Sequence, residues 1–345
     1  MAHITLPERF FPSDLIALND QLWATPEGEP IELDFERVGF LTPMAMIFLV
    51  HRVRAIQFSR KNTRVIATNI ENNEWLRNMG LLTACGLEIF QEHKNRPGDS
   101  ENYIPITVVK KNEFIQKHGL AALQEGVDHE AAALTRILLR VGLGPAFDAV
   151  QYSLREIIRN VFEHSAARTL MYCAQYYPKL RRAHLVIGDD GIGIPNSLRN
   201  NPKFLKLSDK AAVEISLMPG VSGNYLALSG QQGTSRWTNS GYGLYMTSRL
   251  CRNAGQFYVF SNNYGLVLSS DRNNEKSKFS YSLNNFKGTL ICMNIDLGMK
   301  GDFSNHLKKY AEEGKEEAKR IAGAKVIDAS TASLMLRRDF ERSPE

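Results

Sequence analysis

The segment His184–Pro195 (HLVIGDDGIGIP) constrains the fold more than any other part of this chain. Apolar residues 185–187 form a predicted strand, and the strand runs directly into the acidic, glycine-rich turn 189–193. Glycine lets a backbone pass close to another group, and a carboxylate at a strand end can accept a hydrogen bond from an amino group. The pattern therefore predicts a ligand site at the end of a buried strand. An ordinary acidic β-turn is the alternative.

The segment Leu154–Ser165 (LREIIRNVFEHS) has the periodicity of an amphipathic helix. Glu156, Asn160 and His164 are four residues apart, so they share one face of the helix, while apolar residues occupy the other. A carboxylate and a carboxamide at this spacing can serve as a water-activating base and a magnesium ligand. A solvated polar stripe on the helix surface is the alternative.

Two further segments follow in the chain. Asn239–Met246 (NSGYGLYM) places Gly241 and Gly243 at the start of a predicted helix, where unpaired backbone N–H groups suit a phosphate. Lys287–Ile295 (KGTLICMNI) is a predicted strand entered through a Gly-Thr pair. Each of these two segments alone is weak evidence for a ligand site. The informative feature is the order of all four segments along the chain.

The four ordered segments resemble the motifs of the GHKL ATPase superfamily, whose domain is an α+β sandwich of the Bergerat type. The resemblance spans about residues 140–297 and implies that the chain binds ATP and Mg²⁺. It implies that Glu156 is the general base, that Asn160 holds Mg²⁺, and that Asp189 accepts a hydrogen bond from the adenine amine. It also implies nucleotide contacts from Gly191, Gly193, Gly241, Gly243, Leu244 and Thr289. The role of His164 stays open between the site and a structural histidine.

The residues between the two glycine-rich segments are predicted to form a lid over the nucleotide. This stretch, 196–240, is long for a loop inside a compact domain and is rich in glycine. Its basic residues could approach a triphosphate, or they could belong to an ordinary solvated loop. They are Lys203, Lys206, Lys210 and Arg236.

The first third of the chain alternates predicted strands (31–35, 64–70 and 103–109) with predicted helices (43–56 and 71–82), which indicates an α/β layer. Pro105 favours an edge position for the third strand. Residues 30–85 resemble a STAS domain, the fold of anti-sigma-factor antagonists.

Thr42 stands nearest to the serine that is phosphorylated in the STAS family, and a helix N-cap before Pro43 is the alternative. The basic residues that follow are predicted to form a solvated face, with an acidic partner or nucleic acid as alternatives. These residues are Arg52, Arg54, Arg60, Lys61 and Arg64.

A chain of 345 residues favours two domains. We expect a STAS-like α/β domain at 1–114, a helical junction at 115–148, an ATP-binding domain at 149–299 and a charged helical tail at 300–345. In the tail, Lys308 with Glu312, Lys309 with Glu313 and Glu316 with Arg320 have the spacing of helical ion pairs.

Composition restricts the class of protein. The four cysteines are far apart and form no CxxC pair, so we expect buried free thiols and no zinc site. The sequence has no signal peptide pattern and no apolar run long enough for a membrane span, which predicts a cytoplasmic protein. A net charge of +5 is only mildly basic, so nucleic acid is an unlikely partner on this ground alone.

The leading functional hypothesis is a GHKL-type ATPase that acts as a nucleotide-driven switch, with the STAS-like domain docking a protein partner and a homodimer as one possible assembly. His129-Glu130 lies only 31 residues before Asn160, too close for the dimerisation hairpin of a sensor histidine kinase. The chain also ends too soon after Thr289 for the transducer domain of gyrase. The alternatives are a serine/threonine kinase of the anti-sigma-factor kinase type and a non-catalytic nucleotide-binding interaction protein.

Overall fold

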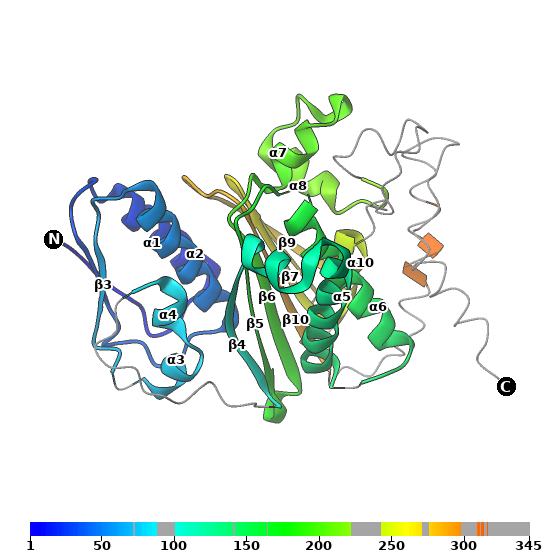
Figure 1. Ribbon diagram of the computed structural model, residues 1–345, viewed down its shortest axis with the longest axis horizontal. Coiled ribbons are helices and arrows are strands. Elements are labelled where there is room, and N and C mark those ends of the chain that lie inside the picture. The colour runs from blue at the N-terminus through cyan, green and yellow to red at the C-terminus, as the bar shows by residue number, and fades with distance from the viewer. Residues whose placement is uncertain are drawn as a thin grey trace.

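The computed structural model describes residues 1–71, 73–87, 101–140, 142–163, 165–221, 243–270 and 276–297, with positions 309, 310, 312, 313 and 316. Two β-sheets organise these residues, a small parallel sheet near the N-terminus and a large antiparallel sheet. In Figure 1 the small sheet and its helices lie to the left of the large sheet, and another group of helices lies to its right.

The N-terminal unit, residues 1–87, contains the small sheet. Its strands pair in parallel in the order β1-β2-β3, with bounds β1 Ala2–Thr5, β2 Ile31–Asp34 and β3 Val65–Thr68. Its helices are α1 Pro12–Ala24, α2 Pro43–Ser59, α3 Glu74–Asn78 and α4 Leu81–Cys85. The single helix predicted over 71–82 is instead two short helices, because Gly80 adopts a left-handed conformation (φ 71°) between them.

Thr42 caps the first turn of α2. Its Oγ1 accepts a hydrogen bond from the backbone N–H of Ala45 at 3.3 Å, and Pro43 occupies the first helical position. The N-cap interpretation of Thr42 is therefore confirmed.

The large sheet has seven strands in the order β4-β5-β6-β10-β7-β8-β9, and every neighbouring pair is antiparallel. The bounds are β4 Tyr103–Lys110, β5 Thr169–Tyr177, β6 Arg182–Asp189, β7 Gly255–Ser261, β8 Tyr264–Ser270, β9 Lys276–Ser282 and β10 Thr289–Asp296. β4 is an edge strand with a register shift between Ile104 and Thr107, which suits a strand that contains Pro105. It lies within the first predicted domain but pairs with β5, so it belongs to the large sheet.

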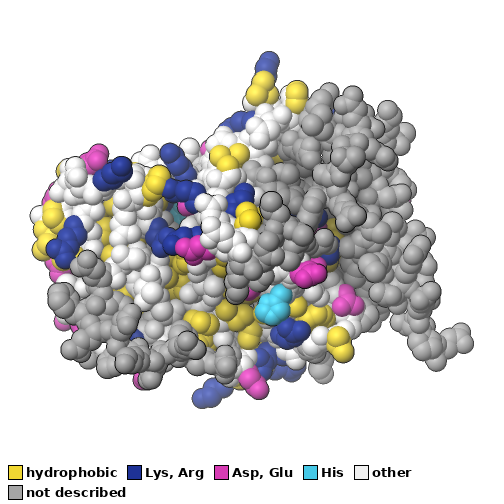
Figure 2. Space-filling view, in the orientation of Figure 1, with side chains coloured by type: hydrophobic (Ala, Val, Ile, Leu, Met, Phe, Trp, Pro, Cys, Tyr) yellow, Lys and Arg dark blue, Asp and Glu magenta, His cyan; other side chains and the backbone are white. Residues whose placement is uncertain are grey.

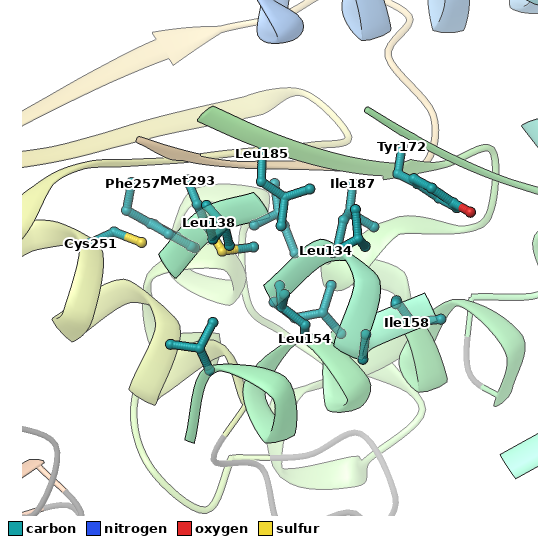
Figure 3. Close-up of a cluster of buried hydrophobic side chains, with 14 of the residues drawn as sticks. Leu134, Leu138, Leu154, Ile158, Tyr172, Leu185, Ile187, Cys251, Phe257 and Met293 are labelled. Carbon is teal, nitrogen blue, oxygen red and sulfur yellow. The ribbon is translucent and has the colours of Figure 1, made fainter. Parts of the chain in front are cut away.

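Helices α5 (Lys111–Leu139), α6 (Pro145–Glu163) and α10 (Gly243–Ala254) cover one face of the large sheet. Figure 3 shows their apolar side chains meeting those of the sheet: Leu134 and Leu138 from α5 and Leu154 and Ile158 from α6 face Leu185 and its neighbours. The shorter helices are α7 Gly193–Arg199 and α8 Asp209–Ser216, with 3₁₀ turns η1 Pro178–Leu180 and η2 Pro202–Phe204.

Helix α2 covers the opposite face of the large sheet. Residues 43–53 of this helix are all buried, as expected for a helix enclosed on every side. A second apolar core joins α2 to the back of the sheet, where Phe48 packs near Phe260 and Phe286. The N-terminal unit and the large sheet therefore share one core.

The predicted burial of the cysteines is confirmed, because Cys85, Cys173, Cys251 and Cys292 are all buried and free. In the C-terminal tail, Lys309 and Glu313 form the predicted ion pair at 3.8 Å, and Lys308 and Arg320 of the other two predicted pairs lie outside the described residues. Among the described helices, none carries an apolar stretch long enough to cross a bilayer.

Candidate functional site

Helix α6 places Glu156 inside the molecule. The side chain of Glu156 is only 3% exposed, so a solvated stripe at this position is excluded. Its Oε1 lies 3.2 Å from Arg159 Nη1 and 3.8 Å from Arg155 Nη2. Burial raises the pKa of this carboxyl above its ordinary value, and the nearby guanidinium groups of Arg159 and Arg155 oppose that rise. Asn160, one turn further on, is half-buried.

Asp189 is the last residue of β6 and is also buried. Its Oδ1 accepts a hydrogen bond of 2.7 Å from the backbone N–H of Gly191, which turns the chain back over the carboxylate. Burial raises the pKa of Asp189 to about 7, although the hydrogen bond from Gly191 lowers it. The neighbouring Asp190 instead accepts bonds from the backbone N–H groups of Arg168 and Thr169.

The glycines of the turn are needed for close packing within the chain. A side chain at Gly191 would overlap the Ser165 carbonyl oxygen, and one at Gly193 would overlap the Asn262 side chain. Gly193 also has φ 78°, a conformation that other residues rarely adopt. The sequence pattern indicated that these glycines allow a ligand to approach the backbone. The contacts in the structure are instead with neighbouring parts of the protein.

Helix α10 begins beside Glu156, the candidate general base. Gly243 is its first residue and packs so closely on Glu156 that a side chain there would meet the Glu156 Cβ. Thr289 begins β10 and pairs with Asp189 on one side and Ser261 on the other. The hydroxyls of Thr289 and Ser261 lie 3.0 Å apart.

These segments converge on one pocket. Seven of the predicted residues line it: Glu156, Asn160, Asp189, Gly193, Gly243, Leu244 and Thr289. Gly191 does not line the pocket, and Gly241 and His164 lie outside the described residues. The volume is about 120 Å³, several times the roughly 15 Å³ that one water molecule needs. The pocket can therefore hold part of an organic ligand.

Sequence reasoning missed three polar residues of the pocket. Ser165 ends the predicted α6 motif but received no role, and Ser197 and Ser216 stand in the predicted lid without any motif. Ile157, Ile187, Ile194, Leu198, Val221 and Ile291 supply the apolar wall. An apolar wall with a few polar groups is the usual composition of a small-molecule site.

The first part of the predicted lid is well packed. Arg199 of α7 donates to Asp209 of α8 at 2.6 Å, and Asp209 also accepts from the backbone N–H of Asn263. The three described lysines of the lid, Lys203, Lys206 and Lys210, are exposed and do not line the pocket. Arg236 and positions 222–240 lie outside the described residues.

The prediction of a solvated basic face around the end of α2 is wrong for Arg52. Arg52 is fully buried, Arg54 donates to the Ala84 carbonyl, and Arg60 donates to the Trp23 carbonyl. Lys61 and Arg64 remain exposed. On the face drawn in Figure 2, Lys and Arg side chains gather where the N-terminal unit meets the rest of the molecule. The sequence could not separate Arg52 from the others because the residues that enclose it, Trp23, Asn285 and Phe286, are far away in the chain.

Within the described ranges, no three His, Cys, Asp or Glu side chains are grouped as they would be around a metal ion. Asn160 is the one predicted magnesium ligand. Mg²⁺ commonly takes only one or two protein ligands, with water and phosphate completing its coordination. The donor set is thus compatible with an ion that arrives with a nucleotide.

Comparisons with known proteins give little support beyond the sequence motifs. The sequence matches no protein-family model and no curated protein. The N-terminal domain of a DNA repair protein is 13% identical, with a TM-score of 0.19, over 55% of this chain and 46% of that one. The ATPase region of Saccharomyces cerevisiae topoisomerase II is 13% identical, with a TM-score of 0.20, over 47% of this chain and 44% of that one. This chain spans under half the length of each of these structures.

Proposed function

We propose that this chain binds ATP with Mg²⁺ in the pocket between α6, α10 and the end of β6. One observation carries the proposal: segments that are far apart in the sequence bring Glu156, Asn160, Asp189, Gly243 and Thr289 to the same pocket. These are the residue types that an adenine nucleotide needs, in the order that the GHKL resemblance implies.

Each residue has a role in the proposal. Asp189 accepts a hydrogen bond from the adenine amine, and Thr289, held by Ser261, supports that contact. The N-terminus of α10, at Gly243, faces the phosphates, where a helix dipole favours negative charge. Asn160 holds Mg²⁺, and Glu156 accepts the proton of the attacking group. Bound MgATP supplies a phosphoryl group for transfer to water or to a hydroxyl.

The protein acts in this proposal as a nucleotide-driven switch, with the N-terminal unit docking a protein partner. A serine/threonine kinase is the second candidate, and a nucleotide-binding protein without turnover is the third. The N-cap hydrogen bond of Thr42 does not favour Thr42 as the phosphate acceptor. Labelled ATP separates the three: free phosphate indicates an ATPase, labelled protein a kinase, and binding without either the third.

Glu156→Gln is the sharpest test of the catalytic role. The amide has the size of the carboxylate but cannot accept the proton, so we expect ATP binding to persist while turnover falls at least about 100-fold. Calorimetric titration with ATP and a phosphate-release assay measure the two quantities. Asp189→Asn is the companion variant, in which binding itself should be lost. Unchanged turnover in Glu156→Gln would remove Glu156 from the mechanism.

A further inference from the structure

Helices α1 and α2 of the N-terminal unit form hydrogen bonds with the loop 283–288, which leads into Thr289. The side chain of Asn19 donates to the Asn284 carbonyl at 2.8 Å, and Asn284 donates to Asp20 Oδ1 at 3.0 Å. One residue further along the loop, Arg52 Nη2 donates to the Asn285 carbonyl at 2.9 Å. Residues 283–288 are therefore tied to the N-terminal unit before the chain enters the pocket at β10.

His51 extends this contact to the pocket itself. The side chain is buried, and its Nε2 lies 3.0 Å from the backbone carbonyl of Asp189. Because a carbonyl can only accept, Nε2 carries the proton and donates it. The ring stacks on Phe286 at 4.7 Å between centroids. Burial, with the nearby charge of Arg52, lowers the pKa of His51 to about 3, so the ring is neutral near pH 7.

Burial of the Arg52 guanidinium costs free energy, because its charge is removed from water. It is fully buried, and its partners in the described part of the chain are the Asn285 carbonyl, His51 Nδ1 at 3.5 Å and the rings of Trp23 and Phe286, none of them a carboxylate. Burial lowers the pKa of the guanidinium to about 9, which still leaves it charged at pH 7. Replacement of a buried ion pair by apolar residues is often neutral or stabilising, and Arg52 is buried without a carboxylate among these partners, so packing alone gives little reason for an arginine here.

The pocket residues are in direct contact with this loop. The Asp189 carbonyl is held between His51 and Gly288, where any side chain would overlap that oxygen. Thr289 follows Gly288 and pairs with Asp189 across the sheet. A displacement of residues 284–288 would therefore shift both of the groups assigned to the adenine amine.

We propose that His51 and Arg52 are positioning residues that set the base specificity of the pocket. Helix α2 of the N-terminal unit would then hold the nucleotide site in shape from outside the pocket. They act through Asp189 and Thr289 and do not touch the ligand. The identity of the ligand rests on the proposed function above. The positioning itself rests on the contacts of His51 and Arg52.

Inosine triphosphate (ITP) tests specificity, because it carries a carbonyl where ATP carries the amine that Asp189 would read. In the full chain, we expect His51→Leu to weaken ATP binding about tenfold, the equivalent of one hydrogen bond. ITP binding should change little, so the preference for ATP should shrink by the same factor. His51→Gln keeps a side-chain donor and should recover much of the preference.

Two further variants separate positioning from general loss of stability. Ile56→Val removes one methyl group from a buried apolar side chain of the same helix that makes no hydrogen bond to the loop, and should leave the preference for ATP unchanged. Arg52→Met should leave the melting temperature equal or higher while still reducing the preference. If the His51 and Arg52 variants kept the wild-type preference for ATP over ITP, the proposal would be overturned.

Amide exchange without nucleotide tests positioning independently of the ligand. The Gly191 N–H, which donates to Asp189 Oδ1, and the Thr289 N–H should exchange faster in His51→Leu than in Ile56→Val. Equal exchange at these two amides in both variants would contradict the positioning role. If the wild type bound no ATP but the two variants still differed in exchange at these amides, the proposed function would fail while the positioning role of His51 stood.

Discussion

Asp189 is a carboxylate buried at the end of a strand, and burial raises its pKa to about 7 from an ordinary 3.8. Because the folded pKa lies above the unfolded one, its contribution to stability is fully present below about pH 4 and is lost as pH rises through about 7. Asp189→Asn stays neutral throughout and keeps an acceptor for the Gly191 N–H. We therefore expect this variant to gain stability relative to wild type between pH 4 and pH 8, by about 4 kcal/mol at most.

Urea unfolding of both proteins at pH 4.5 and pH 8 measures this difference in the free energy of unfolding. An equal effect of the substitution at both pH values would mean that the carboxyl is not strained by burial. A gain at pH 8 combined with loss of ATP binding would show that Asp189 is kept for binding at the expense of stability.

Local sequence patterns predicted the residues of the pocket that belong to motifs and missed those that do not. Glu156, Asn160 and Asp189 stand at spacings that a helix face or a strand end makes recognisable. His51 and Ser261 reach the same site only through pairings with residues more than 25 positions away, which no local pattern carries. The burial of Arg52 was missed for the same reason.

At the scale of elements, predictions succeeded where periodicity differs between two faces. The helical junction predicted over 115–148 is largely formed by α5, and the predicted strands at 31–35 and 64–70 form as β2 and β3. β5, β7 and β8 were missed because most of their residues are buried, and a continuous apolar run has no alternation to detect. β1 was missed because Ile4 is its only buried residue, which leaves no alternation to detect.

The turn between β6 and α7 gives a prediction at this scale. Gly193→Ala places a methyl group at φ 78° and against the Asn262 side chain, so we expect the free energy of unfolding to fall by about 2–4 kcal/mol. Gly142→Ala is the matched control, because Gly142 has open space around it and an ordinary φ, and its effect should stay within about 0.5 kcal/mol. Chemical unfolding measures both. Similar values for the two variants would show that the turn adapts to a side chain.

At the scale of the whole molecule, the length of the chain favoured two domains, but α2 contacts α1 and α4 of the N-terminal unit and also β5 and β6 at the back of the large sheet, within one apolar core. The sequence could not reveal this. The apolar residues of α2 predict a buried helix, and nothing in their spacing identifies which elements cover each side. The consequence is that the N-terminal unit and the pocket share a core and should share their stability.

Two phenylalanines of α2 test that consequence. Phe48 is fully buried between Phe260 and Phe286, whereas Phe58 is 63% exposed and contacts the Arg168 guanidinium. Phe48→Ala should cost about 3–5 kcal/mol and Phe58→Ala about 1 kcal/mol or less. Hydrogen exchange followed by mass spectrometry should show that Phe48→Ala lowers protection in α2 and in β6 and β10 by the same free energy, because one cooperative core holds them. If protection fell in α2 while β6 and β10 kept theirs, the two parts would be independent domains. The proposal that α2 positions Asp189 would then lose its physical basis.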